Sequence, residues 1–135
     1  MIPKPTRAKP VDHEGPVQKS ILQWLEWQFP DWIIHHCKTE INKGGVAFMK
    51  EASRAKSMGA KAGFPDLLVL PWAHIGPVFL EVKAEGNTTS KPQKAMHERL
   101  RGLGYRVAVV RSIEDVQEAL AGWGIASKFH GNSGA

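Results

Sequence analysis

The fold of this chain is decided by the segment Pro65-Asp66-Leu67-Leu68-Val69-Leu70 together with the segment Val78-Phe79-Leu80-Glu81-Val82-Lys83. Residues 71–77, which separate the two segments, begin and end with proline and contain a glycine. Short apolar runs bounded in this way are typical of strands, so the two segments are predicted to form a hairpin.

Two acids and a lysine lie at the ends of these predicted strands. Because side chains alternate along a strand, Glu81 and Lys83 are expected on one face and Val82 on the other. The hairpin would return Glu81 and Lys83 to the neighbourhood of Asp66. Charged groups at the end of an apolar strand cost desolvation energy unless a metal, a partner charge or water compensates. We therefore interpret the three side chains as a candidate metal-dependent site that cuts phosphodiester bonds.

On the N-terminal side, a helix is predicted from about Asp12 to Phe29. Asp12 is a suitable N-cap, and Pro16 is tolerated because it falls in the first turn. The helix has one line of residues that faces the protein interior, and Glu14 extends this line toward the N-terminus. The other members of the line are Gln18, Ile21, Leu25 and Gln28.

Between this helix and the hairpin, residues 32–36 are predicted to be a strand. A loop at residues 42–45 follows, and then a helix from about Ala47 to Met58. Gly59 and Gly63 are expected to end that helix and to lead into the Pro65-Asp66 strand.

On the C-terminal side, Ser90-Lys91-Pro92-Gln93 has the form of a capping box with proline in the first turn, which predicts a helix start. Met96, Leu100 and Leu103 are predicted to be its buried stripe, with Gly104 at its end. A strand at residues 105–110 and a helix at residues 113–120, capped by Ser112, would complete the domain.

The predicted order is α-β-α-β-β-α-β-α, an α/β fold with a mixed sheet covered by helices. Residues 1–11, which are basic and rich in proline, are expected to be a flexible arm. The nuclease-like domain is assigned to residues 12–121, and the glycine-rich residues 122–135 are expected to be a flexible tail.

The composition is that of one globular domain. The chain has 135 residues, of which 42% are hydrophobic and 23% charged, and its net charge is +5. This excess suits an anionic partner such as nucleic acid, although solvated surface lysines would also explain it.

Cys37 is the single cysteine, so an internal disulfide and a multi-cysteine zinc site are both excluded. No apolar run approaches the roughly 18 residues of a membrane span, and we expect a cytoplasmic location without membrane contact.

Four ordered segments resemble the VRR-NUC family of the PD-(D/E)XK nuclease superfamily. They are Gly63-Phe64-Pro65-Asp66-Leu67-Leu68, Phe79-Leu80-Glu81-Val82-Lys83, Ser90-Lys91-Pro92-Gln93 and Gly104-Tyr105-Arg106-Val107. Glu14 with Gln18 resembles the family's first-helix Glu-x-x-x-Gln, so the similarity spans roughly residues 12–118. The resemblance implies a restriction-endonuclease-like fold, action on branched DNA such as four-way (Holliday) junctions, and a homodimer.

Phosphodiester cleavage requires charge neutralisation, a deprotonated water and a stabilised leaving oxygen, all of which a hard cation can supply. Mg²⁺ takes oxygen ligands and keeps several waters, and Mn²⁺ is expected to substitute. Asp66, Glu81 and the carbonyl of Val82 are the expected ligands, with Glu14 as a direct or water-mediated one. Lys83 would orient the attacking water and offset charge in the transition state.

Three further residues are candidates for nucleic-acid contact: Lys61, Lys43 and Gln18. Gln93 is a candidate site residue by resemblance, whereas capping of the helix also explains it. Each charged candidate has a structural alternative. Asp66 can be a turn residue, Glu81 and Lys83 can form an ion pair, and Glu14 can be an acid favoured by the helix dipole.

His35-His36-Cys37 suggests a metal site, but adjacent residues of a strand point to opposite faces, so we expect none there. Trp24, Trp27 and Trp32 are interpreted as core or as a subunit contact.

The sequence thus favours a compact Mg²⁺-dependent DNA endonuclease. The alternative is a non-catalytic nucleic-acid-binding or assembly module on the same fold.

Overall fold

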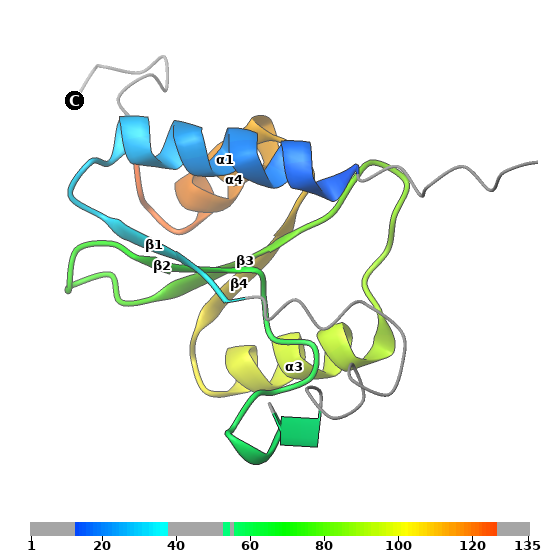
Figure 1. Cartoon of the computed structure of the whole chain (residues 1–135). Helices are drawn as coiled ribbons and strands as arrows, with labels where there is room; N and C mark the ends of the chain where they lie inside the picture. The colour runs from blue at the N-terminus through cyan, green and yellow to red at the C-terminus, as the bar shows by residue number, and fades with distance from the viewer. Residues whose placement is uncertain (1–12, 38–52, 55, 127–135) are drawn as a thin grey trace, which may run out of the picture.

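The computed structural model describes residues 13–37, 53–54 and 56–126 (Figure 1). The order of the elements agrees with the predicted one. The elements are α1 (Glu14–Gln28), β1 (Ile33–His36), β2 (Leu67–Leu70), β3 (Val78–Val82), α3 (Lys91–Gly102), β4 (Arg106–Val110) and α4 (Ile113–Gly122). Most of the helix predicted at residues 47–58 lies outside the described residues, although residues 53–54 and 56–57 are helical.

The four strands form one mixed sheet in the order β1-β2-β3-β4. The predicted hairpin is confirmed, since β2 and β3 pair antiparallel with Leu67 opposite Leu80. β1 joins β2 antiparallel, and β4 joins β3 in parallel after the crossover through α3. β3 is therefore central and is buried at every position, as expected of a strand covered by helices on both faces.

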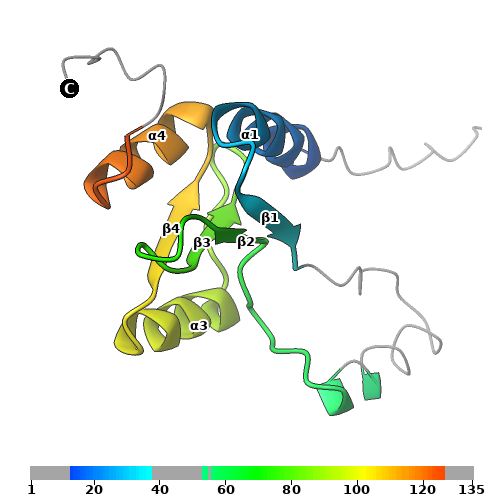
Figure 2. The same ribbon diagram turned by 90° about the vertical axis from the view of Figure 1, so that its left-hand side faces the viewer.

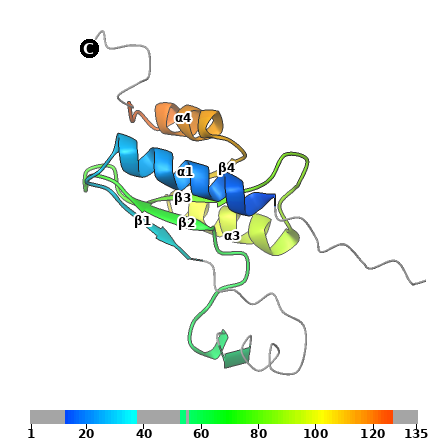
Figure 3. The same ribbon diagram turned by 45° about the horizontal axis from the view of Figure 1, so that its top comes forward.

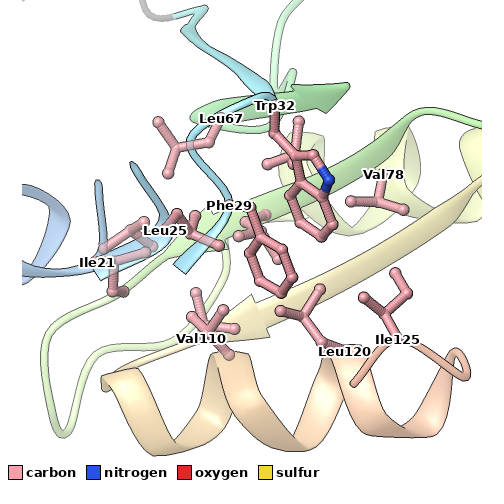
Figure 4. Close-up of a cluster of buried hydrophobic side chains, with 13 residues drawn as sticks. Ile21, Leu25, Phe29, Trp32, Leu67, Val78, Val110, Leu120 and Ile125 are labelled. Atoms are coloured by element: carbon pink, nitrogen blue, oxygen red, sulfur yellow. The ribbon is translucent and has the colours of Figure 1, made fainter. Parts of the chain in front are cut away.

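Helices cover both faces of the sheet, with α1 and α4 on one face and α3 on the other (Figures 1 and 2). Figure 3 looks onto the first face, where α1 and α4 lie side by side. The main core lies beneath them and is drawn in Figure 4. Its labelled members are Ile21, Leu25, Phe29, Trp32, Leu67, Val78, Val110, Leu120 and Ile125.

The core explains most of the predicted line of α1. Ile21, Leu25 and Gln28 are buried, while Glu14 and Gln18 are half-buried. The predicted cap is wrong, because the N-cap position is His13 and its side chain makes no capping hydrogen bond. Asp12 itself lies outside the described residues.

The tryptophans mostly belong to this core. Trp32 is buried and stacks on Phe29 with a ring separation of 3.7 Å, and Trp24 packs at the edge of the cluster. Trp27 is 61% exposed, in agreement with its place off the buried line of α1.

The face covered by α3 has a smaller core of Phe79, Met96, Leu100 and Val107. The predicted stripe is wrong at Leu103, which is 74% exposed. The helix ends at Gly102, and Gly104 takes a positive φ of 94° just beyond the C-cap residue Leu103. The amide of Tyr105 then donates to the carbonyl of Leu100, which closes a Schellman motif and leaves Leu103 outside the stripe.

α4 ends in the same way, which shifts the C-terminal limit of the packed chain. Gly124 has a φ of 80°, and the amide of Ile125 donates to the carbonyl of Leu120 over 2.8 Å. Ile125 is 2% exposed, although it lies in the segment expected to be a tail. Packing therefore continues past residue 121. No helix in the part of the chain that is described is both long and apolar enough to cross a bilayer.

Candidate active site

Asp66 is held just before β2 by hydrogen bonds to the two strands on either side. Its backbone carbonyl accepts from the amide of Cys37, at the end of β1, over 2.8 Å. Its side-chain Oδ2 accepts from the amide of Val82, in β3, over 2.8 Å. The side chain is buried, and this second bond places the carboxylate beside the peptide that joins Glu81 to Val82.

Glu81 is buried beneath α3, with only 1% of its surface exposed. Like Phe79 two residues earlier, it faces α3, whereas Val82 belongs to the core under α1 and α4. Its Oε1 lies 3.3 Å from Nε2 of His97, which is itself 2% exposed. The opposite facing of Glu81 and Val82 follows the alternation expected of a strand.

Burial lowers the pKa of His97, and the positive charges of Arg101 and Lys83 lower it further, while Asp66 opposes them. The neutral imidazole is therefore favoured at neutral pH. Nε2 of His97 and Oε1 of Glu81 lie within hydrogen-bonding distance, and an ionised Glu81 carboxylate would accept from a proton on Nε2.

Lys83 connects this pair to the first helix. Its backbone amide donates to the carbonyl of Val110 over 3.0 Å, which extends the β3–β4 pairing past the end of β3. Its ammonium lies 3.8 Å from Oε1 of Glu14, the first residue of α1.

Of the other four sequence-predicted residues, the structure describes Gln93, Gln18 and Lys61. Gln93 completes the predicted capping box, because its Oε1 accepts from the amide of Ser90 over 2.8 Å. Gln18 is half-buried on α1. Lys61 is exposed and lines a hollow of about 420 Å³ with Cys37 and Phe64. Lys43 lies outside the described residues.

The donor atoms at this centre fit a hard cation. Among the residues that are described, no group of three or more His, Cys, Asp or Glu side chains is placed to hold an ion. The side chains here that could hold a cation are the carboxylates of Asp66 and Glu81, which the hydrogen bond from the amide of Val82 brings to one segment of β3. The carbonyl of Val82 is the third oxygen expected from the sequence. This set suits Mg²⁺, which keeps several waters, and not a structural zinc, which takes four protein ligands. Glu14 is linked to this centre by the 3.8 Å contact between its Oε1 and the Lys83 ammonium.

Sequence reasoning missed His97. A signal for it existed, because His97 comes one turn after Gln93 on the face of α3 that carries Met96 and Leu100. That face must pack on the strand before the crossover, and Glu81 is in that strand. The sequence does not predict the contact of His97 with Glu81, because it does not show at which point along β3 the helix α3 packs.

A mixed α/β sheet that gathers two buried acids and a lysine at the ends of adjacent strands defines a nuclease-type domain of the PD-(D/E)XK kind. The family model "VRR-NUC domain" matches residues 5–114. The chain belongs to the VRR-NUC family, whose members are generally nucleases.

Two solved structures are similar to this chain. A "VRR_NUC domain protein" has a TM-score of 0.63 and 28% sequence identity over 86% of this chain and 90% of its own. A "VRR_NUC domain" has a TM-score of 0.57 and 27% identity over 82% of this chain and 97% of its own. No curated protein matches significantly.

Proposed function

We propose that this protein is a metal-dependent DNA endonuclease that uses Asp66, Glu81 and Lys83. The observation that carries the proposal is the hydrogen bond from the amide of Val82 to Oδ2 of Asp66. It brings a buried carboxylate from the start of β2 against the Glu81–Lys83 segment of β3. Two acids buried this deeply cost desolvation energy, which a bound cation would offset.

Asp66, Glu81 and the carbonyl of Val82 would hold Mg²⁺, with Mn²⁺ as a substitute. When bound, the ion supplies charge neutralisation and lowers the pKa of a water molecule. Lys83 donates hydrogen bonds to the attacking water or a phosphoryl oxygen and offsets the negative charge of the transition state. Glu14 holds the Lys83 ammonium in place through their 3.8 Å contact. Gln93 would act at the edge of the site through its amide group.

The proposed substrate is branched DNA such as a four-way junction, cut by a homodimer. This specificity is supported by the family resemblance and by the net charge of +5, which suits a polyanion. Resolution of a junction needs two symmetric cuts, and one such domain supplies one site, so a two-fold dimer fits the task. Lys61, which is exposed, and Gln18, which is half-buried, are the proposed additional phosphate contacts.

Calorimetry with Mn²⁺ on wild type and on Asp66→Asn tests the metal site. Asparagine keeps a side-chain oxygen that can accept from the amide of Val82, so the fold should be retained while ion binding is lost. Asp31→Asn is the matched control, because Asp31 is exposed in the turn after α1. This variant should bind Mn²⁺ as tightly as the wild-type protein. Heat that survives Asp66→Asn unchanged would contradict the proposal and favour a non-catalytic binding module.

A panel of labelled DNA substrates with Mg²⁺ tests the specificity. Four-way junctions, flaps, nicked duplexes and linear duplexes should be compared for cut position and symmetry. We expect paired, symmetric cuts in the four-way junction and slower cutting of linear duplex. Preferential cutting of linear duplex would overturn the junction assignment and leave the metal site intact.

A further inference from the structure

A buried histidine on α3 faces the proposed metal ligand Glu81. His97 of α3 and Glu81 of β3 are 2% and 1% exposed, and their facing atoms are 3.3 Å apart. The same face of the sheet carries the apolar cluster that includes Met96 and Phe79. Because both residues are almost fully buried, an unpaired polar group would be costly here and a hydrogen bond between the two is favoured.

Packing alone does not explain an imidazole at this position. A leucine or methionine would fill a buried site on an apolar helix face, and replacing a buried polar pair by apolar groups is often neutral or stabilising. The imidazole is useful there if the carboxylate has to be present for another reason. Under the proposed function that reason is ion binding by Glu81.

A second hydrogen-bonding partner does not prevent a carboxylate from binding a cation. Its two oxygens offer about four lone-pair positions, so Oε1 can accept from His97 while the group also ligates. Such a bond restricts rotation of the carboxylate and aims it. Ligating carboxylates are commonly held by partners of this kind, whose mutation typically weakens metal affinity by about 10–100-fold.

We propose that His97 is a positioning residue, which orients the carboxylate of Glu81 for metal binding by donating a hydrogen bond from Nε2. This inference rests on the proposed function, because it requires Glu81 to be a ligand. His97 acts through Glu81 and does not touch the ion or the DNA.

The test is Mn²⁺ affinity of the full chain without DNA, measured by calorimetry for His97→Leu and His97→Gln. We expect His97→Leu to weaken binding by about 10–100-fold. His97→Gln should remain within about three-fold of wild type, because its amide nitrogen is the same number of bonds from Cα and can donate to the same oxygen. The Mg²⁺ concentration for half-maximal cleavage should rise in parallel for His97→Leu, with the maximal rate largely recovered at high Mg²⁺.

Leu100→Ala is the control for a merely structural effect. Leu100 lies one turn further along α3, in the apolar cluster with Met96 and Phe79, and its side chain has no hydrogen-bonding group to offer Glu81. Its truncation should lower the thermal unfolding midpoint and leave Mn²⁺ affinity unchanged.

Two results would overturn the inference. Wild-type affinity in His97→Leu would show that Glu81 needs no partner, and equal weakening in His97→Leu and His97→Gln would show that the imidazole itself is required, as for a direct ligand. The variant Glu81→Gln distinguishes a failure of the His97 inference from a failure of the proposed function. If Glu81→Gln binds Mn²⁺ as tightly as wild type, Glu81 is not a ligand and the function fails; if it loses binding, only the His97 inference is at stake.

Discussion

At the scale of single residues, Gly63 determines how closely the loop before Asp66 approaches α3. Its φ is +75°, in the left-handed region that side chains other than glycine rarely adopt. A Cβ at this position would also overlap the backbone of Pro92, in the first turn of α3. The glycine thus permits both the turn and the close contact that position Asp66.

Gly63→Ala should therefore destabilise the protein by more than the cost of the backbone conformation alone. Gly76→Ala is the matched control, since Gly76 has a φ of +80° and no atom within 4 Å of the added Cβ. We expect the control to lose about 1–2 kcal/mol of unfolding free energy and Gly63→Ala to lose clearly more, as measured in urea. Equal losses would show that the loop moves away from α3 without cost.

The residues of the site were predictable to different degrees. Asp66, Glu81 and Lys83 follow from strand alternation and a hairpin, which are local rules. The contact of His97 with Glu81 depends on how α3 is placed over β3, and sequence periodicity does not fix that placement. The same holds for the Lys83–Glu14 pair, which joins elements far apart in the chain.

At the level of the elements, α3 begins with a capping box formed by Ser90 and Gln93. The amide of Gln93 donates to the Ser90 hydroxyl over 3.3 Å, and the Gln93 side chain accepts from the amide of Ser90. This reciprocal pair accounts for the start of the helix. Whether Gln93 also acts in the site is a separate question, and the two roles can be separated by mutation.

Gln93→Glu retains the capping interaction, because a glutamate oxygen accepts the same hydrogen bond. We expect its unfolding free energy to stay within about 0.5 kcal/mol of wild type, whereas Gln93→Ala should lose about 0.5–2 kcal/mol. If the amide group serves the site, DNA cleavage falls in both variants. Wild-type cleavage by Gln93→Glu would restrict Gln93 to the cap.

Two helices end in a way that the sequence shows only in part. Gly104 and Gly124 both close Schellman motifs, in which the residue after the glycine contacts the last turn of the helix. In the sequence, glycines after a helix also indicate a flexible tail, and for residues 122–126 that interpretation was wrong because Ile125 returns to the core.

Ile125→Ala should cost about 2–5 kcal/mol of unfolding free energy, as expected for truncation of a buried isoleucine. Ala126→Gly is a suitable control, since Ala126 is exposed. A loss below 0.5 kcal/mol for Ile125→Ala, measured by denaturant unfolding, would show that the packed domain ends before this residue.

At the scale of the whole molecule, the alternation of helices and strands predicted the layered α/β fold, and the hairpin gave the antiparallel pairing of β2 with β3. The position of β1 at the edge, and the parallel pairing of β3 with β4, depend on long-range contacts that no local pattern specifies. The net charge of +5 is likewise a property of the entire chain, and under the proposed function it favours binding to the polyanion DNA.

Binding to DNA should weaken steeply as salt increases. A basic protein gains affinity by releasing counterions from the phosphates, so the logarithm of the association constant should fall linearly with the logarithm of salt concentration. The slope can be measured by fluorescence anisotropy at about 50–200 mM KCl. The variant Asp66→Asn, which the proposed function predicts to be inactive, keeps the DNA from being cut during the measurement. A flat response would contradict phosphate-led recognition.

Lys83→Met is the decisive variant for the proposed phosphodiester-cutting site of Asp66, Glu81 and Lys83. Methionine retains much of the length and apolar stem of lysine but removes the ammonium that pairs with Glu14. The measurement is the rate of Mg²⁺-dependent cleavage of a synthetic four-way DNA junction, with DNA binding and thermal unfolding recorded on the same variant. We predict that the folded variant binds the junction and cuts it at least about 100-fold more slowly than wild type. Cleavage by Lys83→Met at the wild-type rate would show that Lys83 has no role in phosphodiester cleavage.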